Sequence, residues 1–431
     1  MGKLVSRNFE RKRNACIADI LKGTIFVRID GEWLPSTAFS ARIGRMRTSD
    51  GPWVLWFKTK HRVRAEESLA SLMVNQNRLK GVSEKICRDH VCDILTELCA
   101  DDVFDIDAMV RKSKENLFDC LKLDFLGFAE HYYELIEKRS CEPVAVRLTL
   151  IPIMPRLRGI SFELSKLDLG LLDRQDADSI DKKIIPRFGK QPWLKEKGAF
   201  QYATKIFQLE EFGYLAFCVE RGTKEWCLEQ SYLKLRAFVA VIMSYLCCVH
   251  KWECFQSVIA PPPREWMQFS EIDCVGWCAS AAEPLMPFLA HGAVLEEFHV
   301  RDIRVWYQKL LSLPSEKISR VEKCANYVNL GSCADGMLKF ILCYIALDAL
   351  FGRRWAVERS IAEGIDRFNP ESSEKAAPLF DLRNEIMHGG SRTIEEWKGY
   401  QMYVGKFRST PERDILKICL SCLFRFPGAL I

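Results

Sequence analysis

Residues 379–390 read LFDLRNEIMHGG and indicate a short helix with an abrupt end. The apolar residues of this stretch recur at helical spacing among charged ones, and the glycine pair supplies the expected stop. With about 100° of turn per residue, Asn384 and His388 share one face of the helix, whereas Arg383 points about 140° away from His388. A long Arg side chain near a fraying helix end can close that gap, so we expect the three side chains to form one cluster.

The same helical spacing continues on both sides of this stretch and covers the last third of the chain. It predicts helices over residues 292–312, 316–330, 336–351, 355–368, 376–388, 394–407 and 411–425. Thr410-Pro411 fits a helix cap followed by a proline in the first turn. Because the connections between these segments are short, the pattern predicts an antiparallel helical bundle over residues 290–431.

The N-terminal part, residues 1–258, shows mixed patterns. Strand patterns occur over residues 24–29, 53–57, 144–150 and 213–226, and helical patterns cover residues 66–138 and 228–249. The run Ala260-Pro261-Pro262-Pro263 can continue neither a helix nor a central strand. The sequence therefore predicts an α+β protein with a mixed N-terminal region of one or two subdomains, a linker at residues 259–289 and the C-terminal bundle.

Composition narrows the class of protein. The 431 residues are 48% apolar and 28% charged, and the formal charge of +5 excludes a strongly basic or strongly acidic binder, so any nucleic-acid contact must be local. The longest apolar runs, Ala237–Val249 and Phe340–Phe351, are too short to span a bilayer. Eighteen cysteines without a secretory signal favour reduced thiols in a core. We therefore expect a cytoplasmic protein without membrane contact.

A second segment, residues 345–351, lies upstream of residues 379–390 and reads IALDALF. Together they resemble the Apea-like HEPN family, whose domains carry an Arg, four to six residues and then a His. Such a spacing is weak evidence alone. However, His388 is the one histidine of seven with an Arg five to seven residues before it, and Asn384 and Gly389 also fit. The likeness covers about residues 290–431, and the first 260 residues resemble no family.

This resemblance implies metal-independent cleavage of RNA, in which the ribose 2′-hydroxyl attacks the adjacent phosphate. His388 would transfer protons, since its ordinary pKa lies near neutrality. Arg383 would donate to phosphate oxygens as negative charge builds up. Asn384 would orient the imidazole or bind a phosphate oxygen. Neither a metal nor a cofactor is implied.

The resemblance also implies partners. In-line cleavage benefits from both an acid and a base, and family members obtain the second His by dimerising. We therefore expect a homodimer through residues 290–431. The family's implied role is that of a toxin-like endoribonuclease in prokaryotic anti-phage defence, with tRNA or mRNA as substrate. The N-terminal region would then sense a phage-derived or nucleotide trigger, an expectation that rests on architecture alone.

Asp348 takes the place of an acidic residue in the family's upstream helix and interrupts an apolar run. Burying its charge unpaired would be costly, so we expect a partner. If that partner is Arg383 or a backbone donor near the site, Asp348 has a supporting role in the site. Arg353 or Arg354 would instead make it a structural residue at the edge of the core.

Six basic residues surround the aromatic residues of the first strand region: Arg42, Arg45, Arg47, Lys58, Lys60 and Arg62. Cations and aromatic rings can hold a single-stranded nucleic acid through phosphate contacts and stacking. Alternating charges are also ordinary on exposed edge strands. The cluster is therefore a candidate nucleic-acid surface with a structural alternative.

Other functions remain open from the sequence. Arg383 and His388 can simply end a helix, or the bundle can be a non-catalytic HEPN scaffold that regulates or binds nucleotides. A zinc-dependent nucleic-acid binder is a third alternative. Its candidate ligands are Cys247, Cys248, His250, Cys254, Cys274 and Cys278. Their spacing matches no recognised zinc pair, so we expect no metal there.

Overall fold

The computed structural model describes residues 2–28, 44–47, 53–58, 60–76, 79–100, 103–105, 116–153, 157–173, 214–250, 264–270, 274–279, 285 and 293–428. Its contacts divide the chain into two compact units, residues 1–145 with 221–226 and residues 146–220 with 227–431. Each unit has its own cluster of buried apolar residues. Helices and antiparallel sheets occur side by side along the chain, and the fold is α+β.

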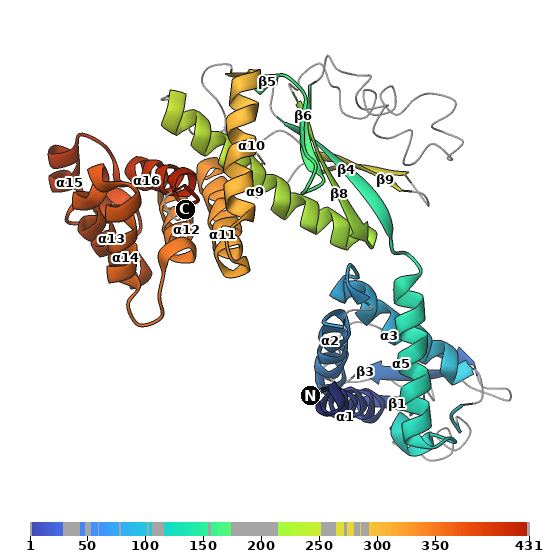
Figure 1. Cartoon of the computed structure of the whole chain (residues 1–431). Coiled ribbons are helices and arrows are strands. Elements are labelled where there is room, and N and C mark those ends of the chain that lie inside the picture. Colours follow the sequence, from blue (N-terminus) through green and yellow to red (C-terminus); the bar gives the residue numbers. More distant parts are fainter. Residues whose placement is uncertain are drawn as a thin grey trace. The chain divides into compact units, whose positions relative to one another are not determined.

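The first unit packs helices around a small sheet. Its elements are α1 (Gly2–Lys22), β1 (Thr24–Arg28), β2 (Gly44–Arg47), β3 (Trp53–Lys58), α2 (Lys60–Val74), α3 (Glu84–Ala100), η3 (Leu117–Cys120) and α5 (Phe125–Cys141). The strand order is β1-β3-β2, with antiparallel pairs. Ile17, Leu69, Leu95 and Tyr132 contribute to the core that α1, α2, α3 and α5 share. The predicted strands at 24–29 and 53–57 are confirmed (Figure 1).

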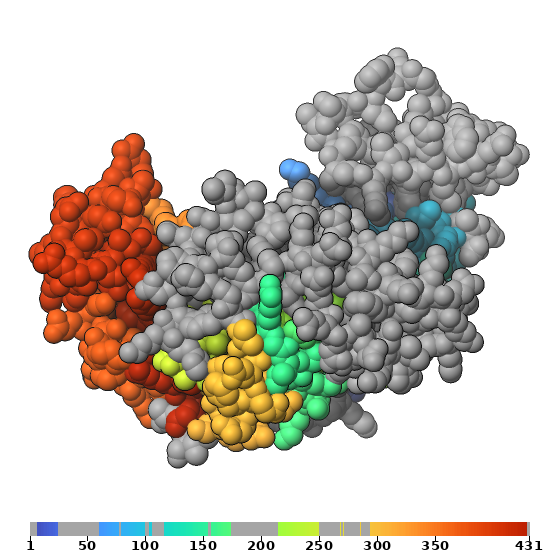
Figure 2. Space-filling view, turned by 90° about the horizontal axis from the view of Figure 1, so that it is seen from above, coloured from blue at the N-terminus to red at the C-terminus, as the bar shows by residue number. Residues whose placement is uncertain are grey.

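The second unit begins with a sheet. Its elements up to residue 295 are β4 (Ala145–Ile153), β5 (Leu157–Gly159), β6 (Phe162–Leu164), β7 (Leu169–Asp173), β8 (Tyr214–Gly222), α9 (Lys224–His250), β9 (Arg264–Ser270), β10 (Cys274–Ala279) and β11 (Ala293–Leu295). The order β10-β9-β4-β8-β7-β6 forms the main sheet, and β11 pairs with β5 in parallel. Through that pair the start of α10 lies beside the β5–β7 region, as Figure 2 shows in amber and green.

Helices make up the rest of the second unit. They are α10 (Glu297–Leu311), α11 (Ser315–Cys333), α12 (Gly336–Phe351), α13 (Val357–Phe368), η5 (Pro370–Lys375), α14 (Ala376–Met387), η6 (Ile394–Glu396), α15 (Tyr400–Phe407) and α16 (Pro411–Arg425). These bounds confirm the helical segments predicted from the apolar spacing, except that residues 394–407 hold a 3-10 turn and a separate short helix. Thr410 lies at the N-cap position of α16 and Pro411 opens the helix, as expected, but the Thr410 hydroxyl donates to the Glu412 carboxylate and does not cap the helix.

The segment predicted as a linker, residues 259–289, contributes to the main sheet. Two strands, β9 and β10, lie in that segment, and β9 pairs with β4, more than a hundred residues earlier. Sheet, α9 and C-terminal helices also share one apolar core, to which Phe238, Tyr307 and Phe340 belong. The helices 297–425 are therefore part of a larger unit. The proline run itself, 260–263, lies outside the described residues.

Helix α9 is the long apolar helix of the second unit. Within the part of the chain that the structure describes, Lys224–Val249 alone is long and apolar enough to cross a membrane by length and composition. Of its most apolar stretch, 61% is buried inside the protein, as expected for a core helix. The apolar run predicted at 237–249 is thus the second half of a longer helix that packs beside the sheet and α10 (Figure 1).

Candidate active site

Helix α14 ends with the glycine stop that the sequence predicts. The amide of Gly390 donates to the carbonyl of Glu385 at 2.8 Å, and the amide of Gly389 donates to that of Ile386 at 3.0 Å. Gly389 has φ +73°, the left-handed conformation that this helix ending requires. A Cβ at Gly390 would lie 2.5 Å from the Glu385 carboxylate, so that position also favours glycine. His388 is therefore held at the C-cap of the helix, directly after Met387.

The core fixes the other end of α14. Leu379 and Leu382 are buried, and the carboxylate of Asp381 accepts a hydrogen bond from Nε1 of Trp397 at 2.9 Å. Trp397 is itself buried. The helix that carries the motif is thus anchored on one face, and its C-terminal end is exposed.

The C-terminal end of α14 carries Arg383, Asn384 and His388, which differ in their exposure to solvent. Arg383 and Asn384 are half-buried, and His388 is exposed. Nη1 of Arg383 donates to Oδ1 of Asn384 at 2.9 Å. The His388 amide donates to the Asn384 carbonyl at 3.0 Å, so His388 lies one turn after Asn384. The bond to Asn384 turns the guanidinium toward the helix face that His388 shares with Asn384.

Two aromatic rings, which sequence spacing did not reveal, support Arg383. Its guanidinium carbon lies 5.9 Å from the ring centre of Tyr344 on α12 and 6.0 Å from that of Phe380. Such cation–π contacts hold a guanidinium in place while leaving its N–H groups available. Burial raises the pKa of Tyr344, Arg383 opposes this rise, and the carboxylates of Asp348 and Glu358 add to it. Tyr344 therefore stays protonated near neutrality.

Asp348 differs from the expectation of a buried charge. It is exposed on the face of α12, and it forms no ion pair with Arg383, Arg353 or Arg354 in the described structure. Its carboxylate lies against the backbone of Gly352, where an added Cβ would come within 3 Å of it. Helix geometry explains the difference, since Asp348 falls on the solvent side of an otherwise apolar helix. The negative charge of Asp348 helps to raise the pKa of Tyr344.

An exposed tryptophan follows α12. Trp355 is 90% exposed and has φ +69°, a rare backbone conformation for a bulky side chain. The guanidinium of Arg354 lies 5.0 Å from its ring centre. Glu358, which acts on Tyr344, lies three residues later. The loop that carries Trp355 thus joins α12, which holds Tyr344, to α13.

The basic cluster of the first unit is only partly described. Arg42 lies outside the described residues, Arg45 and Arg47 lie on β2, and Lys58 ends β3. Lys60 is exposed at the start of α2. The assignment of Arg62 to this surface is wrong: its side chain is buried, donating to Glu66 Oε1 and to Thr24 Oγ1, each at 2.7 Å. A Glu four residues later on a helix was the signal for such a pair.

No disulfide joins the cysteines whose side chains the structure describes. Cys218, Cys343, Cys419 and Cys422 are buried, and Cys247 and Cys248 are half-buried. Cys254 lies outside the described residues. In the regions that the structure describes, no three His, Cys, Asp or Glu side chains come together as a metal site. The strand β10 carries Cys274 and Cys278.

Comparisons with models of known protein families, with curated proteins and with solved structures found no match for this chain. The likeness to HEPN domains therefore rests on the residues of the motif and on the helices around it.

Proposed function

We propose that the chain is a metal-independent endoribonuclease of the HEPN type. The observation that carries the proposal is the arrangement at the end of α14, where Arg383 is hydrogen-bonded to Asn384 and His388 is exposed one turn away. The site combines a fixed cation with an exposed imidazole, a side chain suited to general acid–base catalysis.

The chemistry needs few groups. The 2′-hydroxyl of the substrate loses its proton and attacks the adjacent phosphorus, the bond to the 5′-oxygen breaks, and that oxygen takes up a proton. The products carry a cyclic 2′,3′-phosphate and a free 5′-hydroxyl. His388 serves as the base or the acid, and Arg383 stabilises the charge on the phosphate oxygens. Asn384 positions the guanidinium.

A second copy of the chain supplies the second His in this proposal. Exposed apolar side chains occur on the two helices that meet at the Tyr344–Arg383 contact: Leu338 (58% exposed) and Ile345 share one face of α12, and Met387 precedes His388 on α14. Apolar surface of this kind favours contact with another protein. A two-fold axis through that surface would bring two Arg383 and two His388 to one cleft, and the protein would act as a homodimer.

The surroundings of the motif favour an unpaired RNA strand as substrate. Trp355 offers an exposed ring on which a base can stack, and Arg353 and Arg354 provide cations for phosphates. Single-stranded loops of tRNA, or mRNA, fit this requirement. The proposed biological role is that of a toxin-like effector in the cytoplasm of a phage-infected cell, with the first unit sensing the trigger.

The proposal is tested by incubating the purified full chain with mixed tRNA and mRNA in the presence of EDTA. We expect the wild type to cleave, and Arg383→Ala and His388→Ala each to lower the rate by about a hundredfold or more. Arg359→Ala and His131→Ala are matched controls, because both residues are exposed on other helices, and they should keep the rate.

Equal cleavage by the two motif variants and the wild type would exclude the nuclease and leave the non-catalytic HEPN scaffold in its place. Loss of wild-type cleavage in EDTA would instead indicate a metal-dependent activity.

A further inference from the structure

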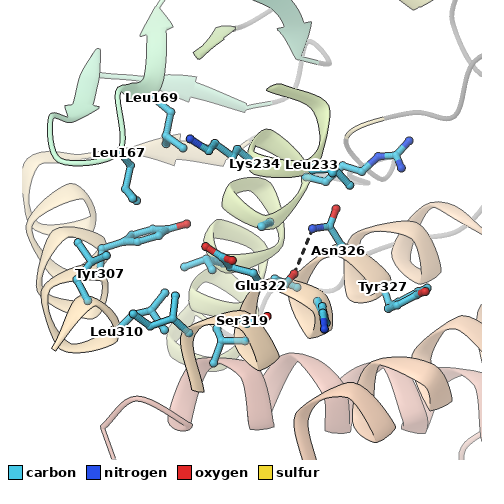
Figure 3. Close-up of a pocket in the computed structure, with 18 of the residues that line it drawn as sticks. Leu167, Leu169, Leu233, Lys234, Tyr307, Leu310, Ser319, Glu322, Asn326 and Tyr327 are labelled. Carbon is cyan, nitrogen blue, oxygen red and sulfur yellow. Dashed lines mark hydrogen bonds between the residues drawn. The ribbon is translucent and has the colours of Figure 1, made fainter. Parts of the chain in front are cut away.

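A cavity of about 460 Å³ lies within the second unit, away from α14 in the sequence. It opens between the β6–β7 turn, α9, α10 and α11 (Figure 3). Most of its walls are apolar, and buried side chains form a large part of them: Leu169, Val241, Trp306, Leu310, Val321 and Ala325. The volume falls within the roughly 300–1,000 Å³ of typical small-molecule sites. Walls of this kind suit an apolar body.

The charged side chains of the lining do not select a charged ligand. Three cations and one carboxylate line the cavity: Lys234, Arg236, Lys323 and Glu322. An ammonium group would therefore meet more cations than anions. A carboxylate group would find Lys234 already in an ion pair with Glu220, which lies outside the lining, and Lys323 exposed to water. Because removing an ion from water is costly unless a partner compensates for it, the lining favours an uncharged ligand.

Tyr307 provides a hydrogen-bonding group inside the cavity. Its ring centre lies 5.0 Å from that of Trp306 and 6.1 Å from that of Phe238, so the ring is held by its neighbours. Its hydroxyl is directed into the cavity in Figure 3 and forms no hydrogen bond with any residue that the structure describes. Burial raises the pKa of this phenol, and the charge of Glu322 adds to the rise, so the hydroxyl keeps its proton. A ligand that accepts a hydrogen bond would satisfy this group.

The same end of the cavity also offers an acceptor. The carboxylate of Glu322 acts on the hydroxyl of Tyr307, and the ammonium of Lys234 acts on Glu322, so the three side chains lie around one space. An alcohol can accept a hydrogen bond from Tyr307 and donate one to Glu322. A carboxylate ligand only accepts, and would meet Glu322 as a like charge. An ammonium group only donates, and would leave the Tyr307 proton without an acceptor.

We infer that this cavity binds a small, uncharged amphipathic alcohol, with its apolar body between α9, α10 and α11 and its hydroxyl between Tyr307 and Glu322. The ligand hydroxyl accepts from Tyr307 Oη and donates to the Glu322 carboxylate. This binding site does not depend on the activity proposed for α14.

Titration calorimetry on the full chain at neutral pH tests the inference with three probes of one body, octan-1-ol, n-octylamine and sodium octanoate, each below its micellar concentration. We expect the alcohol to bind about tenfold or more tighter than either ion, because it enters the cavity without the cost of desolvating a charge. Tyr307→Phe should weaken octanol binding about threefold to tenfold, the effect of losing one uncharged hydrogen bond.

Tyr327→Phe is the matched control. Tyr327 also lines the cavity, but it lies far from Tyr307 in Figure 3, so this variant should bind octanol as the wild type does. Each variant keeps its aromatic ring, and thermal unfolding checks that both remain folded. Binding of octanoate or octylamine as tight as that of octanol, no binding of any probe to the wild type, or equal octanol affinity of the two Phe variants would overturn the inference.

Discussion

Nη1 of Arg383 donates a hydrogen bond to Oδ1 of Asn384 at 2.9 Å, joining two adjacent residues that point in different directions from the helix axis. If this bond positions the guanidinium for catalysis, Asn384→Ala should lower kcat about tenfold, equivalent to about 1.4 kcal/mol, and change KM less. The matched control is Asn14→Ala, which removes the same kind of bond, from Arg13 Nε to Asn14 at 3.0 Å, in the first unit. Equal kcat for both variants would remove Asn384 from the site.

The ending of α14 is expected to be sensitive to one methyl group. Gly389→Ala places a Cβ on a residue with φ +73° and should destabilise the protein by about 1–2 kcal/mol, while disturbing the position of His388 and lowering cleavage. Gly405→Ala is the control: Gly405 lies inside α15 with nothing within 4 Å of an added Cβ, and the change should be neutral or stabilising by up to about 1 kcal/mol. Thermal and denaturant unfolding measure both. A stable, fully active Gly389→Ala variant would show that this ending is not needed.

The exposed face of α12 is expected to hold two copies together. Leu338→Lys puts a charge on that face and should raise the dimer dissociation constant by tenfold or more, with a matching loss of cleavage at low protein concentration. Leu126 on α5 of the first unit is equally exposed, 60% against 58%, so Leu126→Lys should change neither. Light scattering after size-exclusion chromatography gives the oligomeric state. A monomeric wild type with full activity would contradict the composite site.

The stability of the second unit should depend on pH through Glu322. Because burial raises its pKa in the folded chain above the ordinary 4.5, the stability that this group contributes is present at low pH and lost as pH rises through the folded pKa. Glu322→Gln should therefore raise the unfolding midpoint near neutral pH, and the gain should vanish below about pH 4.5. Lys234 and Tyr307 face this carboxylate and remain unchanged, and Lys234 keeps its ion pair with Glu220. A gain that persists at low pH would contradict this linkage.

Local signals in the sequence predicted local structure well. The apolar run at 340–351 became the second part of α12, and the glycine pair ended α14 at His388. These features depend on contacts within a few residues, which spacing and helix caps encode directly. The bond between Arg383 and Asn384 also fits the expectation that a long side chain can close the angular gap.

Contacts between distant segments could not be predicted in the same way. The pairing of β9 with β4 depends on register across more than a hundred residues, and the proline run between α9 and β9 suggested a boundary instead. Tyr344 supports Arg383 only because α12 packs beside α14, and the cavity near Glu322 exists only where four elements meet. Arg62 was misplaced because its charge suggested a surface, whereas Glu66 and Thr24 satisfy it in the interior.

Cleavage of a defined RNA oligonucleotide in EDTA tests the central claim most directly. The substrate is prepared in two forms, fully ribose and with a single 2′-deoxy sugar at the cut site. We expect the wild type to cut the first form and leave a cyclic 2′,3′-phosphate, to leave the second form intact at that position, and to lose cleavage in His388→Ala. Cleavage of the deoxy form at the same position, or unchanged cleavage by His388→Ala, would contradict a nuclease built on Arg383 and His388.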